Sequence, residues 1–203
     1  MLTMACAFGA FAQQPRGAVP AAGAAATQVR IRKVPKLGGG LLVRSPQYRH
    51  DVSRSVTGSR KPREWAQFDV EYETAPEWLD ELTIGFYVMT ETRTPEGKKE
   101  FGFFNVAVTY KDIDRGEHLA TAMLLPQAIL RFGSVVAFGV EISIGGQVQA
   151  KESVIGMPGL SEDWWLDRRV IDAPQVVRRD GYLMDHAQSP FALAYIDDYE
   201  AVK

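Results

Sequence analysis

Strict alternation of apolar and polar side chains constrains the fold of this chain more than any other feature. Within residues 65–74, the apolar side chains Phe68, Val70 and Tyr72 are separated by acidic residues. Because successive side chains of a strand point to opposite faces, the pattern predicts a strand with one buried and one wet face. No comparable stretch carries the period of a long amphipathic helix.

Further segments are also predicted to be strands, some from alternation and others from hydrophobicity or turn signals. A first strand is expected around Val29 and Ile31, and others at residues 82–88, 101–110, 118–125, 135–144 and 147–154. Weaker patterns predict short strands at residues 164–166, 182–184 and 191–195. Many short strands without a long helix favour an all-β fold, an antiparallel β-sandwich.

Turn signals divide these segments. Gly145 and Gly146 predict a tight hairpin between the last two strong strands. Pro126 and Gly133 bracket a short helical turn, since proline favours a helix start and glycine a helix end. A second short turn is expected at residues 76–80, so the sandwich should carry one or two short helical turns.

The first residues resemble an export signal. An apolar run ends in Ala10-Phe11-Ala12 before a polar pair, which is the small-x-small pattern of a secretory cleavage site. Residues 1–12 are therefore predicted to be a signal peptide, and the protein to be exported to the periplasm, the cell surface or the medium. Cleavage would remove Cys6, the one cysteine of the sequence. A lipoprotein is disfavoured because no Leu-rich lipobox precedes Cys6.

Composition sets the expected domain boundaries. Residues 13–27 are rich in Ala, Gly and Pro and predict a flexible leader. Residues 28–203 are expected to form a single domain, in which residues 35–62 make a long basic loop. No segment approaches the roughly 20 apolar residues that cross a bilayer, so no transmembrane segment is expected.

Charge is unevenly distributed along the chain. Residues 28–64, the basic arm, hold ten Lys or Arg and two acidic residues, whereas the chain from residue 65 holds 12 basic and 23 acidic residues. The arm therefore either contacts an acidic partner or folds back on its own acidic body. For an exported protein the partners are anionic lipid, acidic glycan or another protein, rather than nucleic acid. The candidate contacts are Arg30, Arg32, Lys33, Lys36, Arg44 and Arg49.

No motif predicts catalysis, a metal or a cofactor. Residues 112–117 begin like a calcium loop, but Gly116 and Met123 stand where the pattern requires oxygen ligands. The histidines at 50, 118 and 186 have no zinc-site spacing, and no GxSxG elbow is present. An acidic turn is the simpler interpretation of residues 112–117, and no catalytic, cofactor or metal residue is assigned.

Tryptophans offer the best alternative function. Exposed indole rings stack on sugars, so Trp164 or Trp165 could serve a carbohydrate-binding module; on a strand, one ring would face inward and one outward. The simpler interpretation is that both pack against the core. Trp65 and Trp78 flank a strong strand and are expected in the core or at its edge.

Several short signatures resemble one family. They are residues 65–74, Pro76 to Thr83, Gly116-Glu117-His118, Trp164-Trp165, and Ser189 to Ala192 with Asp198 to Ala201. Together they resemble the secreted immunoglobulin-like proteins of Verrucomicrobia associated with type IV pilus components, a family with a member in Akkermansia. The resemblance spans residues 28–203 and implies an immunoglobulin-like sandwich, a pilus-linked role outside the cytoplasm and no enzymatic activity.

These features rank three functions. The leading hypothesis is a non-enzymatic interaction module that docks to a pilus or envelope protein through a sheet edge or the basic arm. A pilin subunit is disfavoured because it would need an apolar N-terminal helix of about 20 residues. A cell-surface carbohydrate-binding module that uses Trp164, Trp165 and the arm is the alternative, and an enzyme ranks third.

Overall fold

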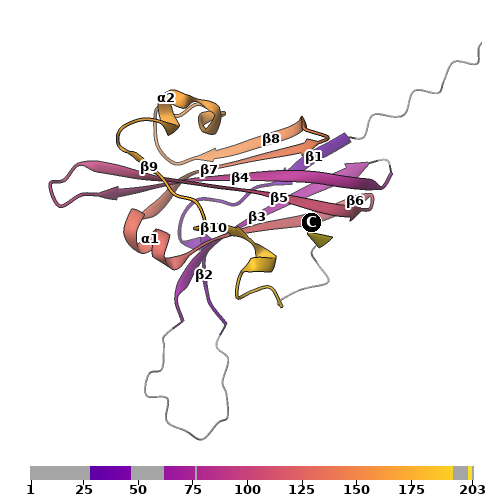
Figure 1. Ribbon diagram of the computed structural model, residues 1–203, viewed down its shortest axis with the longest axis horizontal. Helices are drawn as coiled ribbons and strands as arrows, with labels where there is room; N and C mark the ends of the chain where they lie inside the picture. The colour runs from indigo at the N-terminus through magenta and orange to yellow at the C-terminus, as the bar shows by residue number, and fades with distance from the viewer. Residues whose placement is uncertain (1–27, 47–61, 76, 194–200, 203) are drawn as a thin grey trace, which may run out of the picture.

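Two β-sheets packed face to face form the body of the protein in the computed structural model, which describes residues 28–46, 62–75, 77–193 and 201–202 (Figure 1). The predicted all-β sandwich is thus confirmed. The predicted signal peptide, the leader and Arg49 lie outside the described residues.

The first sheet has five antiparallel strands. These are β1 (Gln28–Lys33), β2 (Leu42–Arg44), β3 (Glu64–Ala75), β6 (Gly116–Leu124) and β10 (Leu183–Asp185). Their order is β1-β3-β6-β10, and β2 also pairs with the start of β3. The alternation seen in the sequence is the burial pattern of β3, in which every second side chain is buried.

The second sheet has six strands. They are β4 (Leu79–Arg93), β5 (Lys99–Ile113), β7 (Ser134–Ile144), β8 (Gln147–Ile155), β9 (Val176–Arg178) and β11 (Ala201–Val202). Their order is β11-β5-β4-β7-β8, and β9 pairs in parallel with β5 at Phe101–Phe103. The Gly145-Gly146 hairpin joins β7 and β8 as predicted.

Strand connectivity identifies the sandwich as immunoglobulin-like. In chain order, β1, β3, β4, β5, β6, β7 and β8 correspond to strands A, B, C, C′, E, F and G. One sheet then reads A-B-E and the other C′-C-F-G, which is the immunoglobulin arrangement. β10 lies beside β6, where strand D would be.

The main core lies between the sheets. Phe68 of β3 stacks on Phe138 of β7 at 5.1 Å between ring centroids, and both side chains are fully buried. The predicted helical turn is α1 (Pro126–Phe132), which places Phe132 against the ring of Phe104. Gly133 ends α1 with φ 80°, a conformation that favours glycine.

A second core covers the outer face of the second sheet. The chain from 156 to 178, here called the cover segment, contains the 3-10 turn η2 (Trp164–Leu166), α2 (Arg168–Ile171) and β9. Figure 1 shows α2 beyond β7 and β8, on the side away from the first sheet. Trp164 and Trp165 pack there with outward side chains of the sheet, including Met89, Phe101 and Phe103. The second sheet is therefore buried on both faces at this end.

Three local predictions are wrong. Residues 39–44 of the predicted basic loop form the 3-10 turn η1 (Gly39–Leu41) and β2, because the segment pairs with the start of β3. Residues 164–166 form η2 rather than a strand, and residues 191–193 form a turn. Trp164 and Trp165 pack on the outer face of the second sheet, so residues 164–166 do not extend its ladder.

Two tryptophan predictions diverge. Trp65 is partly buried and meets Phe191 edge-on at 6.0 Å, so it lies at the core edge as expected. Trp78 is instead 67% exposed. It directly precedes β4, whose first residue Leu79 takes the buried position, so Trp78 has no sheet face to pack against.

Candidate functional site

Trp165 lies flat over a glycine of the second sheet. A Cβ atom added to Gly139 would stand 2.3 Å from Cε3 of Trp165, far closer than any real contact. The ring also stacks on Tyr87 of β4 at 5.4 Å with an interplanar angle of 12°. Glycine inside a strand marks the close approach of another group, and here that group is the indole of the cover segment.

Trp164, the neighbouring residue of the cover segment, also packs on the second sheet. Its ring is fully buried and meets Phe103 edge-on at 5.9 Å and Trp165 edge-on at 5.8 Å. A 3-10 turn advances about 120° per residue, so consecutive side chains need not take opposite faces. Both indoles are consequently buried, with Trp165 only 3% exposed, and neither offers a free ring face for sugar stacking.

Both indole nitrogens are buried donors that lack an acceptor. Nε1 of Trp164 and Nε1 of Trp165 have no hydrogen-bond partner within the described part of the chain. An unpaired buried donor costs about 1–3 kcal/mol. Buried donors without an acceptor are rare in native structures, so these two indole N–H groups call for an explanation, such as a ligand or a water that completes the hydrogen bond.

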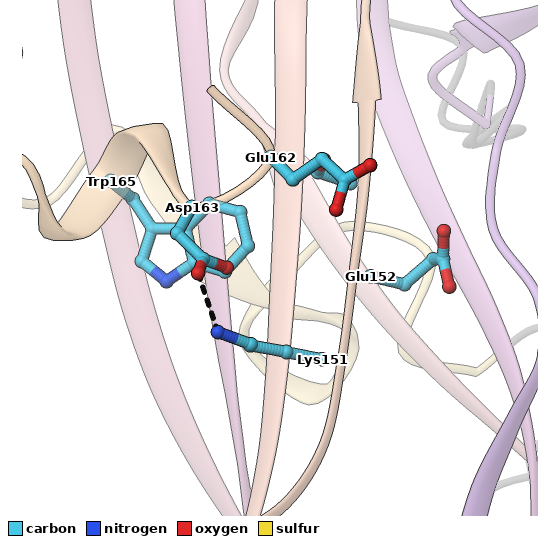
Figure 2. Close-up of a pocket in the computed structure, with 6 residues that line it drawn as sticks. Lys151, Glu152, Glu162, Asp163 and Trp165 are labelled. Carbon is cyan, nitrogen blue, oxygen red and sulfur yellow. Dashed lines mark hydrogen bonds and ion pairs between the residues drawn. The ribbon is translucent and has the colours of Figure 1, made fainter. Parts of the chain in front are cut away.

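A small pocket opens beside Trp165 (Figure 2). Its volume is about 160 Å³, and it lies between β8 and the cover segment. The lining residues are Lys151, Glu152 and Ser153 of β8, and Glu162, Asp163 and Trp165 of the cover segment. Nζ of Lys151 donates to Asp163 across the pocket at 2.5 Å, as the dashed line in Figure 2 marks. The ammonium of Lys151 thus pairs with Asp163, with Glu162 on the same segment, whereas Glu152 extends from the opposite side of β8 (Figure 2).

Two polar side chains of the second sheet, Glu141 and Tyr87, lie near the pocket residues Lys151 and Trp165. Glu141 of β7 pairs in register with Lys151 of β8. Burial raises the pKa of the Tyr87 hydroxyl, and the negative charge of Glu141 raises that pKa further. Tyr87 thus keeps its proton at neutral pH and remains a hydrogen-bond donor.

Some cations in the described part of the basic arm pair with acidic residues of the same chain. Arg32 bridges Glu73 at 3.3 Å and Glu117 at 3.9 Å, and Lys33 bridges Glu71 at 2.5 Å. Further along the arm, Arg44 lies 3.7 Å from Glu64. Arg30 and Lys36 are exposed and make no ion pair with the residues that the structure describes. The described arm therefore folds back on its acidic neighbours, one of the two arrangements expected from its charge.

A Thr-His-Asp cluster holds the turn between β5 and β6. The Thr74 hydroxyl donates to the main-chain oxygen of Asp114 at 2.6 Å and lies 3.0 Å from Nε2 of His118. The carboxylate of Asp114 is 3.7 Å from the same Nε2. In a catalytic triad the two partners use different ring nitrogens, so this geometry fixes a turn rather than activating a nucleophile.

Within the described ranges the structure contains neither a candidate metal centre nor a helix that could span a membrane. No group of three or more His, Cys, Asp or Glu side chains is placed there to hold a metal ion. Among the helices of the same ranges, none has the length and apolar character needed to cross a bilayer.

Sequence reasoning missed the pocket. It named Trp165 for its ring face but not Lys151, Glu152, Ser153, Glu162 or Asp163, which belong to two segments without a shared motif. Gly139 was the signal that could have found it, since a glycine in the most hydrophobic strand indicates that something lies against it.

Comparison with known proteins places the chain in a family. A family model matches residues 24–203, which is most of the sequence. The chain belongs to that family. A crystal structure of a protein from Akkermansia muciniphila has the same fold, with a TM-score of 0.67 and 22% identity over 87% of this chain and 93% of that chain. No curated protein matches. At this identity the structural match shows the shared sandwich alone.

Proposed function

We propose that the protein is a non-enzymatic, exported interaction module, accessory to type IV pilus assembly or to the cell envelope. It docks an extended segment of a pilus or envelope protein along the outer edge of β8. The sequence resemblance to pilus-associated immunoglobulin-like proteins and the fold shared with an Akkermansia muciniphila protein support this role.

The open edge of β8 carries the proposal. This nine-residue strand ends its sheet and, within the described residues, pairs with β7 alone. Val148, near its start, is 51% exposed. Unpaired main-chain groups on such an edge offer hydrogen bonds to an added strand, and alternate side chains select it.

Other edges are better covered. The outer edge of β5 carries β9 at one end and β11 at the other. The edge of β6 carries β10 at residues 122–124. β1 is shorter than β8, and its ladder is interrupted between Ile31 and Lys33. β8 is thus the longest edge among those described without a second hydrogen-bonded strand, although β1 lies close to it.

The basic arm is the weaker docking surface. Arg32, Lys33 and Arg44 already face carboxylates of the same chain, so an acidic partner would have to displace those pairs. Strand addition to β8 displaces no strand that is hydrogen-bonded to it among the described residues, although β1 lies close by and the added segment would have to pack beside it.

Crosslinking and affinity capture test this proposal. Residues 13–203 serve as bait in envelope extract of the source organism, with recovery read by mass spectrometry. Val148→Lys places a second cation on the β8 edge and should reduce recovery of pilus components by about tenfold or more, because charge on an edge strand opposes pairing.

Leu130→Lys is the matched control. Leu130 lies on α1 and is 80% exposed, so the same change there should leave recovery unaltered. Equal recovery with both variants would rule out the β8 edge. Failure of the unaltered bait to recover any pilus or envelope protein would rule out the role itself.

A further inference from the structure

We propose that the pocket between β8 and the cover segment binds one ring of a neutral saccharide. This inference goes beyond the proposed docking function and uses different groups, namely outward side chains of β8 and η2 rather than the main-chain edge of β8. The two proposals can therefore fail separately.

Unpaired donors and acceptors converge on the pocket. Trp165 is only 3% exposed, and its Nε1 donor has no partner within the residues that the structure describes. In Figure 2 the indole nitrogen lies on the edge of the ring nearest the Lys151–Asp163 pair. The described contacts also leave the side chains of Glu162 and Ser153 without hydrogen bonds, so they are available to a ligand, whereas Glu152 extends from the other side of β8 (Figure 2).

These groups select the chemistry of the ligand. The indole N–H needs an acceptor, whereas the carboxylate of Glu162 needs donors. A saccharide hydroxyl supplies both. An amine or a guanidinium supplies donors only and leaves Trp165 unpaired. An anionic ligand would meet the carboxylates of Glu162 and Asp163 and a single ammonium that Asp163 already binds.

Pocket size restricts the ligand to one ring. The volume of about 160 Å³ is smaller than the roughly 300–1,000 Å³ of sites for drug-sized ligands. The Lys151–Asp163 pair lies at the mouth, with its two side chains 45% and 44% exposed. An ion pair so exposed adds little net stability, so it can part to admit a hydroxyl to the indole edge.

This mode differs from stacking on an exposed ring. The ring of Trp165 is held against Tyr87 and over Gly139, so its N–H edge rather than its face would meet the sugar. Acidic glycans, one of the partners expected for the basic arm, are excluded from this pocket by its carboxylates.

The test is NMR titration of residues 13–203, in which the chain's four tryptophans give indole N–H signals. Trp165→Phe assigns the signal of interest. The probes are methyl β-glucoside, methyl β-galactoside and N-acetylglucosamine, with glucuronate and methylammonium as charged comparators. At least one neutral probe should shift the Trp165 signal saturably.

Variants tie the shift to the pocket. Glu162→Gln and Ser153→Ala, both on solvent-accessible side chains, should weaken saccharide binding by about tenfold, the loss of one hydrogen bond to a charged or polar group. Glu77→Gln alters an exposed carboxylate outside the pocket and should leave binding unchanged.

Several results would overturn the proposal. They are no saturable shift with any neutral saccharide, a shift with methylammonium or glucuronate alone, and equal binding by the wild-type chain and both pocket variants. Loss of β8 docking in Val148→Lys with an unchanged sugar response would separate this site from the proposed function.

Discussion

Gly139, a glycine within strand β7, determines which side chain packs on the outer face of the second sheet. Gly139 leaves the space that Trp165 fills, and the space is closed to any Cβ atom. Neither residue alone explains the docking, because a glycine in a strand only weakens the strand and an indole ring alone does not select a docking position. Together they fix where the cover segment docks.

We therefore expect Gly139→Ala to destabilise the protein. The new methyl group would displace the Trp165 ring, and overpacking of this kind costs about 1–3 kcal/mol. Urea unfolding followed by tryptophan fluorescence measures the change. Gly40→Ala is the control, since nothing lies within 4 Å of a Cβ atom added there and its φ is not in the left-handed region. Equal midpoints for the two variants would contradict the packing argument.

His186 gives the protein a pH-dependent stability at the residue scale. Burial lowers the pKa of this side chain from 6.5, although the negative charges of Asp185 and Asp69 oppose the change. The unfolded chain thus binds the proton first as pH falls below 6.5, so stability declines from that pH down to the lower pKa of the folded state. Well above pH 6.5 both states are neutral at this site and its contribution is constant.

His186→Gln removes this titration. Urea midpoints at pH 7.5 and pH 5.5 should differ less in the variant than in the wild-type chain. A variant that loses as much stability on acidification as the wild type would show that other groups, chiefly carboxylates, cause the loss.

Elements with a regular period were predictable from sequence, and the cover segment was not. Strict alternation located β3, β4 and β5, hydrophobicity located β7, the Gly145-Gly146 turn located β8, and Pro126 with Gly133 located α1. In the cover segment, consecutive Trp164 and Trp165 are both buried in a 3-10 turn, which no periodic pattern encodes. Its conformation depends on Phe103, Tyr87 and Gly139, which are distant in sequence.

We predict that Trp164→Ala loosens the cover segment before it unfolds the sandwich. Truncating a fully buried tryptophan costs about 3–5 kcal/mol, and the cavity would lie in the outer core rather than between the sheets. Hydrogen exchange should accelerate first at residues 156–178, while β3 and β6 stay protected. Uniform acceleration across both sheets would show instead that the two cores unfold together.

At the scale of the whole molecule, the class of fold was easier to predict than the pairing of its strands. Two-faced strands imply a sandwich, and the family resemblance implied the immunoglobulin arrangement that the strand order confirms. Strands β9, β10 and β11 have three residues or fewer, too short for a period to identify their partners. Charge asymmetry was visible in the sequence, but its partial neutralisation depends on β1 lying beside β3, where Arg32 and Lys33 meet Glu73 and Glu71.

Strand β9 is synthesised well after β5, the strand with which it pairs, and this delay matters during translation. β5 ends at Ile113, and the first strand to cap its outer edge, β9, begins 63 positions later at Val176. At synthesis rates of about 5–20 residues per second, that edge stays open for roughly 3–13 s after β5 has emerged. An open edge is a template for pairing with other chains. Nascent molecules of this protein are therefore most prone to aggregate during those seconds, long before the finished sandwich exists.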